Sequence, residues 1–251
     1  MIAPVLNSPQ TLLPTLVKQG FAVLDASSVC ALSGCSLPDL LDVSSFWADL
    51  PPDQHLKDGG RYRRRRHSCF VVEGAGLRQV PHRPHWQPLE YNALHGGMHR
   101  GFEPMAADML ARPVWPQLLK WLGQVACALR GEQPWFVEAH PFRIDTTDGI
   151  GRPTPEGAHR DGVDLVAVFL VGRHGIKGGE TRVFDADGPA GQRFTLTQPW
   201  SLLVLDDARV IHESTPIQPQ DPGAALACRD TLVITLRARA FQGQDALGAS
   251  D

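Results

Sequence analysis

Residues 201–213, SLLVLDDARVIHE, decide the fold, because they hold two short apolar segments on either side of a polar turn. Ser201–Leu205 and Val210–Glu213 are rich in Leu, Val and Ile, which is typical of strands. Five further segments repeat this pattern between clusters of Gly, Pro and Asp: Trp135–Ile144, Leu165–Val171, Thr181–Phe184, Gln192–Leu196 and Thr231–Arg239. Short strands so closely spaced along a chain favour a two-sheet jelly roll or a barrel.

Helical patterns dominate before about residue 132. Helices are predicted over residues 8–18, 36–50 and 104–129, with a break in the last at Pro113 and Pro116, and a short strand over Phe21–Leu24. We therefore predict one α+β, mainly β domain over residues 1–251. In it, helix-rich residues 1–132 buttress and cover a core over about 133–241. This core is predicted to be a double-stranded β-helix (a cupin-like jelly roll).

The composition excludes several classes of protein. The chain has 251 residues, with 24 basic and 27 acidic side chains and a net charge of −3, which argues against a nucleic-acid partner. No stretch approaches the ~18 apolar residues of a membrane span, and the first residues lack the basic start of a secretory signal. The five cysteines have no regular spacing and are expected to be reduced thiols, so a cytoplasmic location is predicted. The oligomeric state is not predicted.

The segment Pro155–Gly162, PEGAHRDG, carries the first chemical signal. Residues two apart on an extended strand point to the same side, so His159 and Asp161 share a face. His212, 51 residues beyond Asp161, offers a second imidazole on another strand. Two histidines and one carboxylate are the ligand set of non-haem Fe(II) oxygenases, in which half of the coordination positions stay open. The alternative is a surface turn in which His159 and Asp161 form an ordinary hydrogen-bonded pair.

A second signal lies on the last predicted strand. Arg229 and Thr231 are two residues apart and share a face. A buried guanidinium with a neighbouring hydroxyl suits the far carboxylate of a C5 dicarboxylate. The alternative is an ordinary ion pair between Arg229 and Asp230 or another carboxylate.

Four segments in order, PEGAHRDG, GGET, LDDARVIHESTPI and RDTLVITL, resemble the bacterial 2-oxoglutarate/Fe(II)-dependent dioxygenase family that includes free L-amino-acid hydroxylases of the L-isoleucine type. The likeness extends upstream to WFVEAHPFRID and YNALHGGMHRGFEP. The resemblance implies that His159, Asp161 and His212 bind Fe(II) and that Arg229 anchors 2-oxoglutarate; Thr231 is our own extension from strand geometry.

By the same resemblance, the chain is expected to be a dioxygenase that hydroxylates a small molecule, a free L-amino acid, with O2 consumed and succinate and CO2 released. Two alternatives stay open. The same core could act on a protein side chain, or the chain could be a catalytically silent jelly roll that senses a metabolite.

Residues 61–66, RYRRRR, contain five arginines with three possible roles. They could form an exposed loop, a patch for nucleic acid or an acidic protein, or a clamp in which one or two arginines fold over the iron and hold a substrate carboxylate. On a strand, Arg61, Arg63 and Arg65 share one face.

Other polar residues are interpreted as structural. His82 and His85 are expected in a loop, and His140 as a core histidine with its hydrogen bonds satisfied. Three carboxylates near the motifs are expected in turns or in supporting roles rather than as general bases: Glu156, Asp206 and Asp207.

Overall fold

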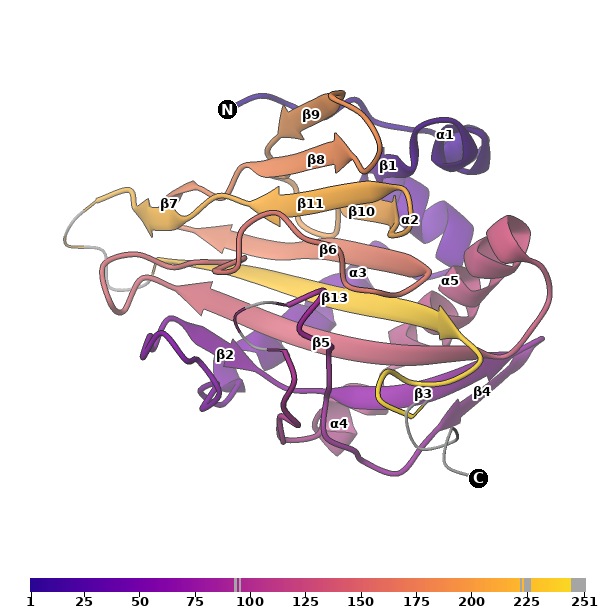
Figure 1. Ribbon diagram of the computed structural model, residues 1–251, viewed down its shortest axis with the longest axis horizontal. Helices are drawn as coiled ribbons and strands as arrows, with labels where there is room; N and C mark the ends of the chain where they lie inside the picture. Colours follow the sequence, from indigo (N-terminus) through magenta and orange to yellow (C-terminus); the bar gives the residue numbers. More distant parts are fainter. Residues whose placement is uncertain (93, 95, 222, 224–226, 245–251) are drawn as a thin grey trace.

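The computed structural model describes residues 1–92, 94, 96–221, 223 and 227–244. Its largest element is an antiparallel sheet with the strand order β1-β10-β6-β13-β5-β3-β4, in which β2 also pairs with β5 (Figure 1). The strands of this large sheet are β1 (Phe21–Leu24), β2 (Arg63–Arg65), β3 (Ser68–Glu73), β4 (Gly76–Gln79), β5 (Trp135–Asp145), β6 (Leu165–His174), β10 (Leu202–Asp206) and β13 (Cys228–Ala238).

Shorter strands form the second layer, in the orders β11-β8-β9 and β12-β7. They are β7 (Ile176–Gly178), β8 (Thr181–Asp185), β9 (Gly191–Phe194), β11 (Val210–Ser214) and β12 (Ile217–Pro219). Apolar side chains of β8, β9 and β11 pack against those of β1, β6 and β10 in one buried cluster. The two layers therefore face each other as a jelly roll, which confirms the predicted fold class.

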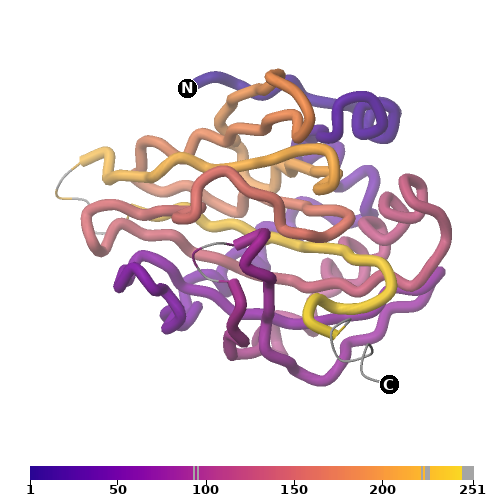
Figure 2. The backbone as a smooth tube through the Cα atoms, viewed as in Figure 1, coloured from indigo at the N-terminus to yellow at the C-terminus, as the bar shows by residue number. Residues whose placement is uncertain are grey.

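Helices cover the other face of the large sheet, behind it in the view of Figures 1 and 2. They are α1 (Leu12–Gln19), α2 (Ala26–Ser33), α3 (Leu37–Val43), the 3-10 helix η1 (Ser44–Asp49), α4 (Ala107–Leu110) and α5 (Val114–Arg130). The Ser36 side chain caps α3 by accepting from the Asp39 N–H, and Gly131 ends α5. Because the helices fill one face of the sheet with apolar side chains, the other face is left to line a cavity between the layers.

The structure confirms all seven strands predicted after residue 132 and the strand over Phe21–Leu24. It adds strands and a helix that the sequence pattern did not indicate, among them β2, β3, β4 and α2. Strands from the first 132 residues thus lie in the same sheet as β5, β6, β10 and β13. Among the helices described, none has the length and apolar character needed to cross a membrane.

Candidate metal centre

His159, Asp161 and His212 lie together between the two layers. The backbones of His159 and His212 pair, with N–H to O=C distances of 3.0 and 2.9 Å, and this pairing closes the gap of 51 residues between Asp161 and His212. The Nε2 atoms of His159 and His212 lie 3.6 and 3.8 Å from the Asp161 carboxylate oxygens. One donor atom from each of the three residues lies within 4.8 Å of the others. The structure therefore brings the predicted ligand set together.

The orientation of His159 suits metal binding. Its Nδ1 lies 3.0 Å from the Gly157 carbonyl oxygen and donates to it, so Nε2 is the nitrogen that faces Asp161 and the centre of the triad. Gln87 donates from Nε2 to Asp161 Oδ1 at 3.3 Å, which holds the carboxylate in place. The Gly157 contact engages Nδ1 of His159 and not Nε2, and the Gln87 contact engages Oδ1 of Asp161 and not Oδ2, the oxygen that faces His212.

Protonation of the triad also fits a cation. Although burial opposes it, the Asp161 carboxylate raises the pKa of His159 to about 10, and His159 lowers the pKa of Asp161 to about 2. Burial and the neighbouring His159 lower the pKa of His212 to about 4. Without a metal, His159 is thus protonated beside the ionised Asp161 carboxylate, and His212 is neutral. A divalent ion would displace that proton, as metal ligands require, so the residues present fit Fe(II).

Asp207 supports the loop that carries Asp161. Its buried carboxylate accepts backbone N–H groups from Asp161, Gly162 and Val163 at 3.0, 2.8 and 3.1 Å. Burial and the nearby Asp161 carboxylate raise the pKa of Asp207 to about 7, although the three N–H donors oppose this. Asp207 is therefore a supporting carboxylate, as expected. Asp206, by contrast, forms an ion pair with Arg130.

Asp207→Asn is expected to weaken metal binding by about 10–100-fold, the usual cost of losing a group that orients a ligand. The amide keeps one acceptor oxygen where the carboxylate has two, so the three N–H groups cannot all be satisfied. Metal affinity measured by titration checks this. Asp206→Asn is the matched control, because it removes a buried carboxylate that does not contact the Asp161 loop. Equal metal affinities in the two variants would contradict the role assigned to Asp207.

A cavity of about 130 Å³ adjoins the triad. Arg229, Thr231, Val233 and Thr235 alternate along β13 and line it, so Arg229 and Thr231 share a face as predicted. Asp230 points away from them and pairs with Arg143 at 2.7 and 2.8 Å, so the alternative ion pair between Arg229 and Asp230 is wrong.

Arg229 is only 4% exposed, and burial together with Arg173 lowers its pKa to about 10. Across residues 1–92, 94, 96–221, 223 and 227–244, the structure records no hydrogen bond or ion pair of its guanidinium. A buried cation without a protein counter-charge is costly unless an anion binds it. The Arg229 environment therefore suits an anionic ligand.

The arginine run divides between the inside and the outside of the fold. Arg63 and Arg65, on β2, are buried and line the cavity, so an exposed loop is the wrong description for these two. Arg64 and Arg66 pair with Asp145 and Glu103. Arg61, predicted to share the inward face, lies before β2 with a side chain that is 75% exposed and pairs with Asp148.

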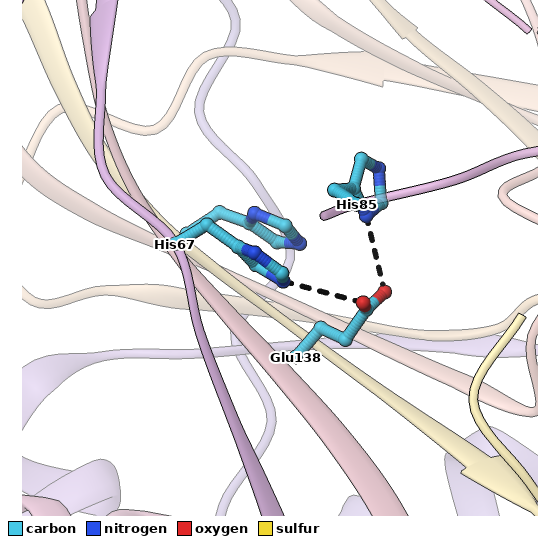
Figure 3. Close-up of side chains that lie close together, drawn as sticks. His67, His85 and Glu138 are labelled. Carbon is cyan, nitrogen blue, oxygen red and sulfur yellow. Dashed lines mark hydrogen bonds and ion pairs between the residues drawn. The ribbon is translucent and has the colours of Figure 1, made fainter. Parts of the chain in front are cut away.

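A second buried cluster contains His67, His85, Glu138 and His140 (Figure 3). Glu138 lies between two imidazoles, 3.2 Å from His67 Nε2 and 3.2 Å from His85 Nδ1. His140 stacks on His67 with ring centroids 4.6 Å apart. It also lines the cavity, where its Nδ1 lies 2.7 Å from Arg65 Nη2.

This second cluster fits a cation less well than the triad does. Its carboxylate already accepts from both neighbouring imidazoles, and a guanidinium lies against His140, so a divalent ion would meet a positive charge at short range. His140 is hydrogen-bonded, as expected of a core histidine, but it also faces the cavity. His82 and His85 lie outside the helices and strands, as expected of a loop, but His85 is buried and reaches Glu138, whereas His82 contacts the Phe102 carbonyl.

The buried histidines predict a loss of stability in acid. Burial lowers the pKa of His85 to about 4, despite the nearby Glu138, and also lowers the pKa values of His67 and His140. The unfolded chain binds more protons than the folded chain between pH 6.5 and 4. The free energy of unfolding therefore falls across this range, and His85 alone contributes a fall of about 2 kcal/mol between pH 7.5 and 5.

Thermal unfolding of the metal-free protein at pH 7.5 and 5.0 measures this effect. His85→Gln cannot bind the proton and is expected to lose less stability than the wild type over the same interval. An unchanged pH dependence in this variant would show that His85 is not held in its neutral form.

Comparisons with known proteins identify the family of the chain. A model of the 2OG-Fe dioxygenase family matches residues 44–235. The crystal structure of a bsmA homolog from Methylobium petroleophilum PM1 is similar at a TM-score of 0.90 and 54% identity, covering 96% of this chain and 97% of that one. A comparison with curated proteins finds no match.

Two more distant structures share the fold. IDO from Bacillus thuringiensis is similar at a TM-score of 0.74 and 16% identity, covering 96% of this chain and 100% of that one. The Fe(II)/(alpha)ketoglutarate-dependent dioxygenase TqaL is similar at 0.70 and 18%, covering 94% and 89%. The family match spans both the triad and Arg229. The chain thus belongs to the 2OG-Fe dioxygenase family and is a dioxygenase that uses Fe(II) and 2-oxoglutarate.

Proposed function

We propose that this dioxygenase hydroxylates a free L-amino acid, with His159, Asp161 and His212 as the Fe(II) ligands and Arg229 and Thr231 as the 2-oxoglutarate anchor. The observation that carries the proposal is that all five side chains line one cavity. A metal chelated by one end of a C5 dicarboxylate needs a cation at the other end. Arg229 is such a cation: it is buried, and none of the described residues forms an ion pair with it.

The protein contributes geometry, charge and the exclusion of water. Two neutral imidazoles and one carboxylate leave half of an octahedral coordination sphere open and cancel only part of the 2+ charge, so an anionic co-substrate is still attracted. Arg229 supplies a planar fork for a carboxylate, and the Thr231 hydroxyl adds a donor. When bound, Fe(II) and 2-oxoglutarate would supply the chemistry that activates O2: one oxygen atom of O2 would enter the C–OH group, and the other would enter succinate as 2-oxoglutarate loses CO2.

The cavity contains both positively and negatively charged side chains, which supports a free amino acid as the substrate. Buried guanidinium groups of Arg65 and Arg100 face it, and so does the carboxyl group of Glu156. The Glu156 Oε2 atom is buried and has no hydrogen-bond partner among the residues described. A zwitterion brings a carboxylate and an ammonium group to these side chains at once. Glu156 would then contact substrate, in addition to the structural role expected for it.

The walls of the cavity also favour a small aliphatic molecule over a protein. Phe142, Val168 and Val233 provide apolar walls that suit an aliphatic side chain. A residue within a polypeptide has neither a free carboxylate nor a free ammonium group, so it would leave the buried charges unpaired. The intact donor set and the family match disfavour a catalytically silent sensor.

Succinate formation tests the proposal. The protein is loaded with Fe(II) and 2-oxoglutarate without oxygen, and the weak visible charge-transfer band of the chelate is recorded. Oxygen is then admitted with a panel of free L-amino acids and with peptides that contain the same residues. We expect the band, and succinate above the substrate-free level with at least one aliphatic amino acid. Succinate with peptides only, or with no member of the panel, would contradict the proposed substrate class.

A further inference from the structure

Besides Arg229, two buried arginines that line the cavity, Arg65 and Arg100, have no carboxylate at hydrogen-bond distance within the described part of the chain. Arg63 pairs with Asp53 at 2.7 Å and is neutralised within the fold. The recorded hydrogen bonds of Arg65 and Arg100 go to neutral acceptors: Arg65 Nη2 lies 2.7 Å from His140 Nδ1, and Arg100 Nη2 donates to Gln87 Oε1 at 2.7 Å.

The two guanidinium groups also leave donors unused. Within the part of the chain that the structure describes, the buried Nε atoms of both arginines have no hydrogen-bond partner. Arg65 is 4% exposed and Arg100 is 2% exposed, so bulk water cannot solvate either charge. Burial without an adjacent carboxylate is costly for a cation. An anionic ligand in the cavity would offset that cost.

Strand register separates the Arg65 backbone from the strand that carries the 2-oxoglutarate anchor. Phe142 on β5 pairs with Arg65 of β2 on one side and with Thr231 of β13 on the other. Arg65 therefore lies two strand spacings, of about 4.8 Å each, from Thr231. An anion that binds Arg65 occupies a place distinct from the one at Arg229.

Arg100 places that anion beside the metal centre. Its guanidinium bonds to Gln87, and Gln87 in turn donates to Asp161 at 3.3 Å. The Arg100 backbone also pairs in both directions with His85, which lines the same cavity. A carboxylate bound by Arg100 thus lies close to Asp161, because Gln87 alone links the two side chains.

Two aromatic rings and His140 hold the Arg65 guanidinium in one orientation. Its guanidinium lies 3.8 Å from the Phe102 ring centroid and 4.2 Å from that of Phe142. The Nδ1 atom of His140 can accept from Arg65 only while that ring is neutral, and burial favours the neutral form. A planar fork held between two rings loses little freedom on binding, so it is preorganised for a carboxylate.

We propose that Arg65 and Arg100 bind the substrate's carboxylate and select free acids over their uncharged derivatives. This inference rests on the proposed function, because it names the residues that recognise one end of the amino acid. It predicts a substrate class defined by the carboxylate: a free aliphatic acid binds, and the matching carboxamide does not.

The test compares L-leucine and L-isoleucine with their carboxamides in the wild type, Arg65→Met, Arg100→Met and Arg65→Lys. Arg61→Met is the matched control, since Arg61 belongs to the same run but is exposed and pairs with Asp148. Two readouts are used: KM and kcat from succinate formation, and the thermal stabilisation of the metal-free protein by each compound. Binding alone raises stability, so the second readout does not need turnover.

We expect each Met variant to raise the KM for the free acid by at least about 30-fold, since removal of one charge-assisted hydrogen-bonding partner costs roughly 2–3 kcal/mol. The preference for acid over amide should collapse, stabilisation by the acid should disappear, and the KM for 2-oxoglutarate should stay within a few-fold of the wild type. Arg65→Lys should recover part of the loss, and Arg61→Met should behave as the wild type.

Several outcomes would overturn the proposal. Both Met variants could keep the wild-type preference for the acid, or the wild type could bind acid and amide equally well. A raised KM for 2-oxoglutarate would instead assign these arginines to the co-substrate. If acids stabilise the wild type but not the variants while no amino acid yields succinate, carboxylate recognition stands and the proposed hydroxylation fails.

Discussion

His159→Ala is expected to lower the affinity for Fe(II) by more than about 100-fold. Loss of a group that only orients a metal ligand already lowers metal affinity by about 10–100-fold, and His159 is itself a ligand. The variant removes one of two imidazoles from a set of three donors. The remaining Asp161 and His212 supply only two donors, which is too few to hold the ion tightly. Metal titration and the visible band of the Fe(II)–2-oxoglutarate complex measure the loss, and succinate formation should fall to the level of the metal-free protein.

His174→Ala is the control for this variant, because His174 is exposed at the end of β6 and belongs to neither histidine cluster. It should bind Fe(II) as the wild type does. Thermal unfolding of the metal-free proteins separates misfolding from loss of the ligand: His159→Ala should unfold within a few degrees of the wild type. An undiminished visible band in a folded His159→Ala variant would refute the ligand assignment.

Arg229→Met is expected to raise the requirement for 2-oxoglutarate by two to three orders of magnitude. Breaking a buried ion pair costs about 3–5 kcal/mol, and each 1.4 kcal/mol corresponds to tenfold in affinity. The metal content should not change, since Arg229 does not contact the triad's donor atoms. Titration of 2-oxoglutarate into the anaerobic Fe(II) protein, followed by the visible band, measures the change.

Two further variants sharpen this prediction. Arg229→Lys keeps the charge but loses the planar fork, so it should restore part of the affinity. Thr231→Val removes one donor, and we expect a smaller effect of about tenfold. Unchanged 2-oxoglutarate affinity in Arg229→Met would require another anchor, and Arg65 and Arg100 would then be the candidates.

The strands of the jelly roll were predictable because each is a run of apolar residues between turns. The segments Leu165–Val171 and Ser201–Leu205 both follow this rule and became β6 and β10. β2 was not predictable in the same way. Its residues are Arg63–Arg65, and arginines form a buried strand only where other parts of the chain supply Asp53 and aromatic rings.

The triad was predictable because each residue carries a local signal. His159 and Asp161 are two apart on an extended segment, and His212 lies in a strand-like run. In the second cluster Glu138 and His140 are also two apart on one strand, but His67 and His85 come from separate segments that meet them only in the fold. Arg100 is similar: its sequence neighbours are Gly and His, and only its pairing with His85 places it in the cavity.

The position of the bound metal tests the central claim most directly. Crystals of the protein grown with Fe(II) and 2-oxoglutarate without oxygen, measured on both sides of the iron absorption edge, locate the ion by its anomalous signal. We predict one strong peak among His159 Nε2, Asp161 and His212 Nε2, with 2-oxoglutarate extending from it toward Arg229. A peak among His67, His85, Glu138 and His140 with none at the triad would contradict the account.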